Sequence, residues 1–219
     1  FYRLGVRYMT LTHSLTLDWA DSATDTHKHK GLTKFGRDII NEMNRLGMFI
    51  DISHVSVEVM RAAIKQSRAP VIASHSSAKA VADHARNVPD DVLKLIRKNG
   101  GVIMVNFYSG FTHPKAAITM KEMFSKKREF EQKFADQAKA DRAYKAWKQQ
   151  NPIELGDVKT IADHIEHIIK VAGIEHVGYG GDYDGVDYLP HQLEDVSGYP
   201  YLTQELLNRG YKAKDIHKI

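Results

Sequence analysis

The sequence predicts a parallel α/β fold, and among parallel folds it favours a (β/α)8 barrel of the TIM type. Short apolar runs alternate with amphipathic helical stretches, which is the pattern of repeated strand, loop and helix units. No G-x-G-x-x-G follows the first apolar run and no G-x-x-x-x-G-K-[ST] occurs, so a nucleotide-binding doubly wound sheet loses its main support. Since about five units are recognisable where a barrel needs eight, we expect a barrel that is incomplete at its N-terminus.

Five strands and five helices are predicted from the spacing of apolar residues. The strands are expected at residues 6–11, 48–52, 71–74, 102–106 and 177–180. The helices are expected at residues 35–46, 57–66, 91–98, 158–172 and 202–209. Ser56 is well placed to cap the second helix, and Glu58 then lies in its first turn, where the helix dipole favours an anion.

A segment at about residues 114–156 interrupts this rhythm within what we expect to be a single domain spanning residues 1–219. Its apolar residues recur mostly at steps of three and four, so we predict a helical insertion laid against the domain surface. Residues 112–151 hold ten Lys and Arg against five Asp and Glu, a local charge of +5 in a chain of net charge +4. A basic helix with interspersed acids is typical of a solvated face, and nucleic-acid binding is not expected. The alternative role for the segment is a lid over the site.

The composition limits the chemistry. The chain has 219 residues, 42% of them hydrophobic, and its longest apolar runs fall far short of the roughly 20 residues of a membrane span. We therefore expect a soluble protein, with the bacterial periplasm or cytoplasm as its predicted compartment. The absence of cysteine leaves only His, Asp and Glu to hold a metal ion. Because the first residues enter a strand-like run directly and the last ones stop within a helix-like run, we expect a fragment of a longer protein.

Two histidines occupy equivalent positions in successive units. In MFIDISHVS the apolar run ends on His54, and in PVIASHSS it ends on His75. In parallel α/β folds the carboxyl ends of the strands gather the reactive groups at one face, so these side chains are expected to converge. Neutral imidazole is a good zinc ligand, and two make half of a tetrahedral shell. The alternative is a pair of buried histidines that only bond their neighbouring serines.

A third strand end supplies a carboxylate. In VGYGGDYDG, Asp182 follows two glycines that permit close backbone approach. A calcium-binding EF-hand does not fit, because Gly185 is the fourth residue from Asp182 rather than the sixth and the acid at position twelve is missing. An aspartate that only caps a turn is the remaining alternative.

His13 and Arg86 complete the predicted site. His13 ends the first strand in YMTLTHS, on the same face as the other two histidines, and Arg86 lies in the loop HARNVPDD. A guanidinium suits a substrate carboxylate, although a solvated surface position is the alternative for a single arginine. Histidines, an aspartate and an arginine together indicate metal-assisted hydrolysis of a small anionic substrate.

Six motifs in order resemble those of the membrane dipeptidase family, also called renal dipeptidases, which are zinc dipeptidases. They are GVRYMTLTHS, GMFIDISHVS, APVIASHSSA, RNVPDDV, GGVIMVNFYS and HVGYGGDYDGV, the last followed by LEDVSGYP. The resemblance covers nearly the whole chain outside residues 114–156. It implies a metal-dependent hydrolase barrel with two zinc ions, which hydrolyses dipeptides that have a free carboxylate, some with a D-residue at the C-terminal position.

The resemblance also implies roles for individual residues. His54 and His75 match the two histidines that ligate one zinc ion, and Asp182 matches the aspartate that passes a proton to the leaving amine. His13 matches the histidine at the scissile carbonyl oxygen. Arg86 matches the arginine that receives the substrate carboxylate, and Tyr108 in the NFYS motif is assigned to substrate binding. A zinc-bridging hydroxide is the implied nucleophile.

The family's His-x-Asp motif for the other zinc ion and its bridging glutamate have no match in this chain and are expected upstream of it. This chain alone is therefore predicted to be inactive or nearly so, and a homodimer is a further expectation. Two rivals to the dipeptidase hypothesis remain. One is another metal-dependent amidohydrolase or lactonase on the same barrel, and the other is a barrel remnant that binds a ligand without turnover.

Overall fold

The computed structural model describes residues 1–219, apart from the side chain of Phe124. Its centre is a sheet of five strands, all parallel, in the spatial order β1-β2-β3-β4-β5. The strands are β1 (Tyr8–Thr10), β2 (Phe49–Asp51), β3 (Ile72–Ala73), β4 (Val102–Val105) and β5 (Val177–Tyr179). Neighbours in sequence are neighbours in the sheet, as in a β/α barrel, whereas a doubly wound sheet reverses its order at a switch point. The prediction of barrel-type topology is confirmed.

Each predicted strand is present but shorter than expected. β1, for example, covers Tyr8–Thr10 although the apolar run extends over residues 6–11. Residues next to the strands still bond across the sheet, as the amide of Ile52 does to the carbonyl of Ile72 at 2.8 Å. The chain then turns away into the loops that carry the candidate site residues, and this turn ends the regular ladder.

Helices follow the strands and pack beside one another in chain order. They are α1 (Lys34–Leu46), α2 (Val57–Gln66), α3 (Asp90–Asn99), α7 (Val158–Ala172), α8 (Tyr199–Asn208) and α9 (Ala213–Ile216). Single 3-10 turns lie at Tyr2–Leu4, Ile174–His176, Tyr183–Gly185 and Val196–Gly198. The amphipathic pattern places one face of each long helix in the core, as the fully buried Ile161, Ile165 and Ile168 of α7 illustrate.

Sequence patterns locate most helix ends. Ser56 caps α2 as predicted, and its side chain accepts a hydrogen bond from the amide of Val59 at 3.2 Å. The α8 helix begins three residues earlier than predicted, because Pro200 lies in its first turn, where a missing N–H is tolerated. None of the helices among the described residues has both the length and the apolar character needed to span a membrane.

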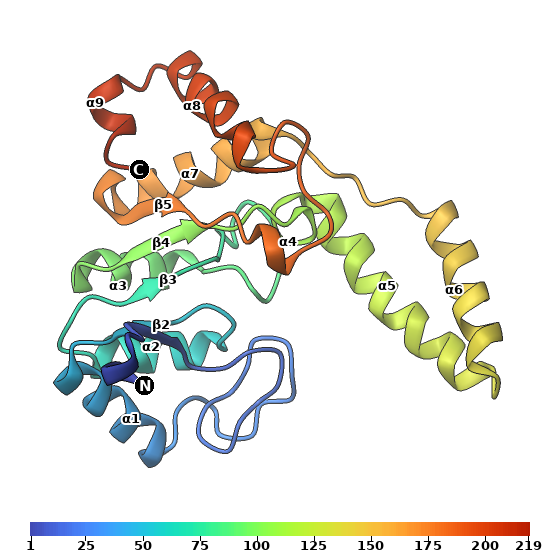
Figure 1. Ribbon diagram of the computed structural model, residues 1–219, viewed down its shortest axis with the longest axis horizontal. Helices are drawn as coiled ribbons and strands as arrows, with labels where there is room; N and C mark the ends of the chain where they lie inside the picture. The colour runs from blue at the N-terminus through green and yellow to red at the C-terminus, as the bar shows by residue number, and fades with distance from the viewer.

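The segment after β4 forms a short helix, α4 (Ser109–Thr112), and two long ones, α5 (Pro114–Lys133) and α6 (Gln137–Gln150). Figure 1 shows α5 and α6 side by side and extending away from the sheet, so the expectation that they lie against the domain surface is wrong. Their apolar residues pack chiefly where the pair begins and ends. There Met120 and Met123 of α5 form a small cluster with Tyr108, and Tyr144 and Trp147 of α6 pack against it.

Candidate active site

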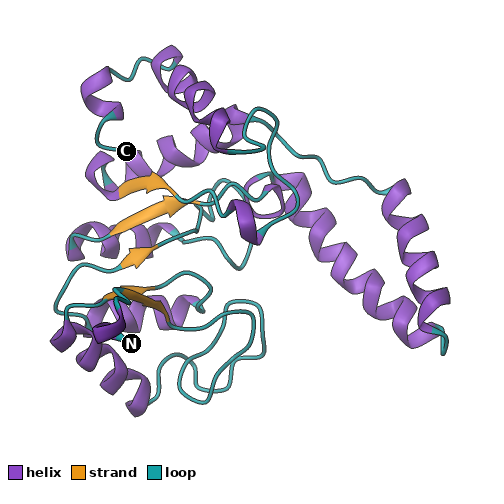
Figure 2. Ribbon diagram, viewed as in Figure 1, coloured by secondary structure: helices purple, strands orange, loops and turns teal.

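Figure 2 shows the loops that follow the strands gathered at the carboxyl ends of the sheet. A cavity of about 680 Å³ lies among them. All six residues predicted for the site line this cavity. They are His13, His54, His75, Arg86, Tyr108 and Asp182. Their convergence follows from the topology, because parallel strands bring the residues after their carboxyl ends to one face. Nothing in their location tests the individual roles, which stay predictions.

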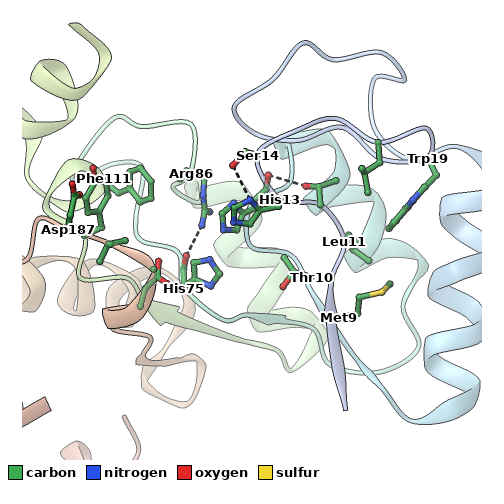
Figure 3. Close-up of a pocket in the computed structure, with 17 residues that line it drawn as sticks. Met9, Thr10, Leu11, His13, Ser14, Trp19, His75, Arg86, Phe111 and Asp187 are labelled. Carbon is green, nitrogen blue, oxygen red and sulfur yellow. Dashed lines mark hydrogen bonds between the residues drawn. The ribbon is translucent and has the colours of Figure 1, made fainter. Parts of the chain in front are cut away.

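Three of these residues form a row of imidazole rings. His13 stacks on His54 with ring centroids 4.3 Å apart, and His54 meets His75 edge to face at 4.8 Å. The three follow β1, β2 and β3 respectively, which are adjacent in the sheet. Figure 3 shows His13 and His75 at the centre of the cavity, close to Arg86.

The backbone of His54 holds an uncommon conformation. Its φ is 68°, in the left-handed region that non-glycine residues rarely adopt. Two donors hold its carbonyl oxygen in place, the amide of Ala23 at 2.7 Å and the hydroxyl of Thr12 at 3.2 Å. The hydroxyl of Ser22 lies 3.3 Å from the same oxygen but makes its shorter bond, at 2.7 Å, to the carbonyl oxygen of His13. Together these bonds fix the direction in which the imidazole leaves the chain.

The two histidines predicted to bind a metal ion are neutral. Burial, with a smaller effect of nearby Arg86, lowers the pKa of His54 to about 2 and also lowers the pKa of His75. Neutral imidazole is the form that ligates zinc, so this donor pair fits half of a tetrahedral zinc shell. Within the part of the chain that the structure describes, no group of three or more His, Cys, Asp or Glu residues is arranged to hold a metal ion.

Asp182 enters the cavity from the end of β5. Like His54 it is left-handed, with a φ of 60°. A side chain at Gly180 would collide with the carbonyl oxygen of Ser74, which explains one of the two glycines before it. The amide nitrogen of the Asn106 side chain donates to Asp182 Oδ2 at 3.0 Å, and Asn106 Oδ1 accepts from the amide of Tyr108 at 2.5 Å. Asn106 thus holds the carboxylate in place.

Arg86 is almost completely buried, with 2% of its surface exposed, so the alternative of a solvated arginine is wrong. Its Nη2 donates to the carbonyl oxygen of His75 at 3.4 Å, and its guanidinium lies 5.4 Å from the ring centre of Phe111. Its Nε and Nη1 have no hydrogen-bond partner among the described residues. Burial lowers the pKa of Arg86 to about 10, a value at which it is still a cation at neutral pH.

Tyr108 borders the cavity at the base of the α5–α6 pair. It is buried, which raises its pKa, and its hydroxyl donates to the sulfur of Met120 at 3.3 Å. The hydroxyl thus bonds α5 in this structure, while the ring lines the cavity. A role of Tyr108 in substrate binding stays a prediction.

Sequence reasoning missed two polar residues that support the site, Asp51 and Asn106, and considered Ser74 only as a neighbour of His75. Asp51 and Ser74 lie beside His75, and Asn106 bonds Asp182. Two signals point to them in the sequence. Asp51 is a charged residue inside a buried apolar run, and Asn106 follows β4 at the same kind of strand end as the histidines.

Known proteins resemble this chain along its whole length. The family model described as "Membrane dipeptidase (Peptidase family M19)" matches residues 1–219. Dipeptidase 3 of Rattus norvegicus and Dipeptidase 3 of Mus musculus are 40% and 39% identical to the chain over 224 residues. Each match covers 100% of this chain and 38% of the relative, so the chain spans well under half the length of these proteins.

Solved structures share the fold. The probable dipeptidase PvdM from Pseudomonas aeruginosa superposes with a TM-score of 0.83 at 27% identity, over 98% of this chain and 60% of that one. A metallopeptidase from Rhodobacter sphaeroides, crystallised with a phosphinate mimic of the dipeptide L-Ala-D-Ala, superposes with a TM-score of 0.76 at 26% identity. The match covers 100% of this chain and 54% of that one. With its six motifs, its strand order and the family match over its full length, this chain belongs to the membrane dipeptidase family, peptidase family M19.

Proposed function

We propose that the protein containing this chain is a zinc-dependent dipeptidase that acts on dipeptides with a free C-terminal carboxylate. The observation that carries the proposal is the guanidinium of Arg86. It is buried in the same cavity as His54 and His75, and two of its nitrogens have no hydrogen-bond partner in the described part of the chain. A buried cation with unused donors is costly, and a carboxylate that binds it bidentately removes that cost. A small substrate carboxylate beside a pair of metal-binding imidazoles fits a dipeptide.

The chemistry divides between the metal and the side chains. When bound, zinc supplies a hydroxide nucleophile at neutral pH and polarises the peptide carbonyl. His13 donates a hydrogen bond to the carbonyl oxygen while charge develops on it. Asp182 takes the remaining proton of the attacking oxygen once that oxygen has bonded the carbonyl carbon, and gives this proton to the amine nitrogen as the C–N bond breaks. Arg86 and Tyr108 hold the C-terminal end of the substrate.

The related Rhodobacter sphaeroides structure supports the substrate class, because its ligand mimics L-Ala-D-Ala. We therefore include dipeptides with a C-terminal D-residue among the substrates. Since His54 and His75 are half of one zinc shell, the proposal also holds that residues 1–219 by themselves hydrolyse dipeptides little or not at all. A homodimer in solution and a bacterial periplasmic or cytoplasmic location stay predictions.

The test uses the zinc-loaded intact protein and four substrates: L-Ala-L-Ala, L-Ala-D-Ala, the C-terminal amide of L-Ala-L-Ala, and a cyclic amide. We expect hydrolysis of the two free dipeptides only. Arg86→Met should raise KM for them on the order of 100-fold with a smaller change in kcat, because truncating one partner of a buried charge pair costs about 2–5 kcal/mol. Arg61→Met is the matched control, since Arg61 is partly exposed and pairs with Asp91 at 2.8 Å on the helices.

Equal hydrolysis of the amide, with no effect of Arg86→Met, would contradict a carboxylate site. Preferential cleavage of the cyclic amide would favour the amidohydrolase or lactonase hypothesis instead. No hydrolysis of any substrate by the zinc-loaded intact protein would favour a ligand-binding barrel without turnover.

A further inference from the structure

A fully buried carboxylate lies directly behind the candidate metal site. Asp51, the last residue of β2, has no exposed surface. Its Oδ1 accepts from the backbone amides of Ser53 and Ser74, both at 3.0 Å. Its Oδ2 accepts from the hydroxyls of Thr10 and Ser74, both at 2.6 Å. These four bonds satisfy both oxygens, as a buried carboxylate requires, and they join the carboxyl ends of three neighbouring strands.

Ser74 also contacts the imidazole of His75. Its Oγ lies 2.8 Å from His75 Nδ1 and 2.6 Å from Asp51 Oδ2. A hydroxyl has one proton, and an ionised carboxylate only accepts hydrogen bonds, so the proton of Ser74 lies toward Asp51. The distance of 2.6 Å is typical of a hydroxyl bonded to a charged oxygen. Ser74 Oγ can then only accept from the imidazole.

This proton count determines the tautomer of His75. If Ser74 accepts, the Nδ1 atom of His75 carries the ring proton and donates it. In a neutral imidazole the lone pair then belongs to Nε2, the ring nitrogen that Ser74 does not contact. The ring nitrogens of His54 make no comparable hydrogen bond among the described residues, so this arrangement is specific to His75. His54 is oriented through its carbonyl oxygen instead.

We propose that Asp51 and Ser74 are positioning residues that fix the tautomer and orientation of His75, so that its Nε2 lone pair is presented to the zinc ion. The inference rests on the proposed function, because only a metal ligand needs its lone pair aimed in this way. Histidines that ligate metals usually donate their other N–H to a carboxylate, a carbonyl or a water, and loss of that partner typically weakens metal binding 10- to 100-fold. Here a serine hydroxyl connects the imidazole to the carboxylate.

The first test reads the tautomer without any metal. The intact, zinc-free protein is labelled with ¹⁵N-histidine, and the His75 signals in a long-range proton–nitrogen NMR spectrum are identified by their loss in His75→Gln. We expect the Nδ1–H tautomer in the wild type and a shift toward Nε2–H in Ser74→Ala. Ser77→Ala is the control, because Ser77 is buried in the same loop but its hydroxyl donates to the carbonyl oxygen of Asn106 at 3.3 Å and not to Asp51.

The second test measures zinc affinity by competition with a chromophoric chelator. We expect Ser74→Ala to bind zinc 10- to 100-fold more weakly, Ser77→Ala to stay within about twofold of the wild type, and Ser74→Thr to restore binding. Thermal unfolding establishes that each variant is folded. If Ser74→Ala does not fold, Ser74→Cys replaces it, since it keeps the volume but supplies only a weak acceptor, and it should show the same changes to a smaller extent.

The outcomes separate the two proposals. An Nε2–H tautomer in the wild type, or a tautomer and a zinc affinity that Ser74→Ala leaves unchanged, would overturn the role of Asp51 and Ser74. If the tautomer shifts as expected while neither Ser74→Ala nor His75→Gln weakens zinc binding, the hydrogen-bond relay stands and the metal site of the proposed function falls.

Discussion

Two candidate site residues hold backbone conformations that are costly outside glycine. His54 and Asp182 have φ values of 68° and 60°, and each follows the carboxyl end of a strand. Such residues persist only where their surroundings fix them, and they concentrate at functional sites. The bonds from Ala23 and Thr12 to the carbonyl of His54 and the bond from Asn106 to Asp182 supply that support. The two side chains are therefore preorganised for their proposed roles.

Asp182→Asn tests the proposed proton transfer. The amide keeps the shape of the side chain but cannot take up and pass on a proton, so we expect kcat to fall about 10²- to 10⁴-fold. Zinc content should stay at the wild-type level, since the proposal gives Asp182 no metal-binding role. Asp184→Asn is the control two residues away, on an exposed residue, and should leave kcat within about twofold. Loss of zinc from Asp182→Asn in proportion to activity would contradict the assignment.

The α5–α6 pair is the element whose position sequence analysis did not predict. Periodicity indicates that a segment is helical, but it does not say whether the apolar face meets the body or a partner helix. Here the apolar residues serve mainly to join α5 to α6 and to the base cluster of Tyr108, Met120 and Met123. The far end extends away from the sheet (Figure 1).

Two variants distinguish the contribution of the base of the α5–α6 pair to activity from that of its far end. Replacement of residues 127–142 by a short Gly-Ser turn removes only the projecting part, so we expect kcat and KM for dipeptides within about twofold of the wild type. Met120→Ala should instead raise KM, because it removes the sulfur that holds the hydroxyl of Tyr108 at 3.3 Å. Steady-state kinetics on both variants provides the check. A large loss of activity in the trimmed protein alone would support the lid alternative.

His164 joins α7 to two site-bearing segments. Fully buried, it accepts at Nδ1 from the amide of Ala78 at 3.0 Å, and its Nε2 bonds the carbonyl oxygen of Thr112 at 2.9 Å. Burial lowers its pKa from 6.5 to about 4. Between these values the unfolded chain binds a proton that the folded chain does not. Its contribution to stability is therefore complete above about pH 6.5 and is lost as the pH falls toward about 4.

The expected loss in the free energy of unfolding from His164 is on the order of 3 kcal/mol over that interval. Urea unfolding midpoints between pH 7.5 and pH 4.5 measure it, and His164→Gln should show a weaker pH dependence than the wild type. His191→Gln is the control, because the His191 side chain is 70% exposed. His84, whose pKa burial also lowers to about 4, changes stability in the same direction in all three proteins. Equal slopes for His164→Gln and the wild type would contradict this account.

For the whole molecule, the strands and the convergence of the six candidate residues on one cavity could be predicted from the sequence. Local apolar runs indicate where the strands end, and a parallel topology places the residues that follow them at one face. What it misses depends on contacts between distant segments. The burial of Arg86, the left-handed backbone of His54 and the bonds from Thr10 and Ser74 to Asp51 arise only when separate strands meet. The residue types alone do not predict which of these distant segments contact one another.

The central claim is that His54 and His75 hold a zinc ion in a dipeptidase site, and elemental analysis of the intact protein tests it most directly. We predict two zinc ions per chain in the wild type and the loss of at least one in His54→Ala and in His75→Ala, with dipeptide hydrolysis falling in parallel. His191→Ala, an exposed histidine outside the cavity, should retain both ions. Full zinc content and full activity in folded His54→Ala and His75→Ala would contradict the claim.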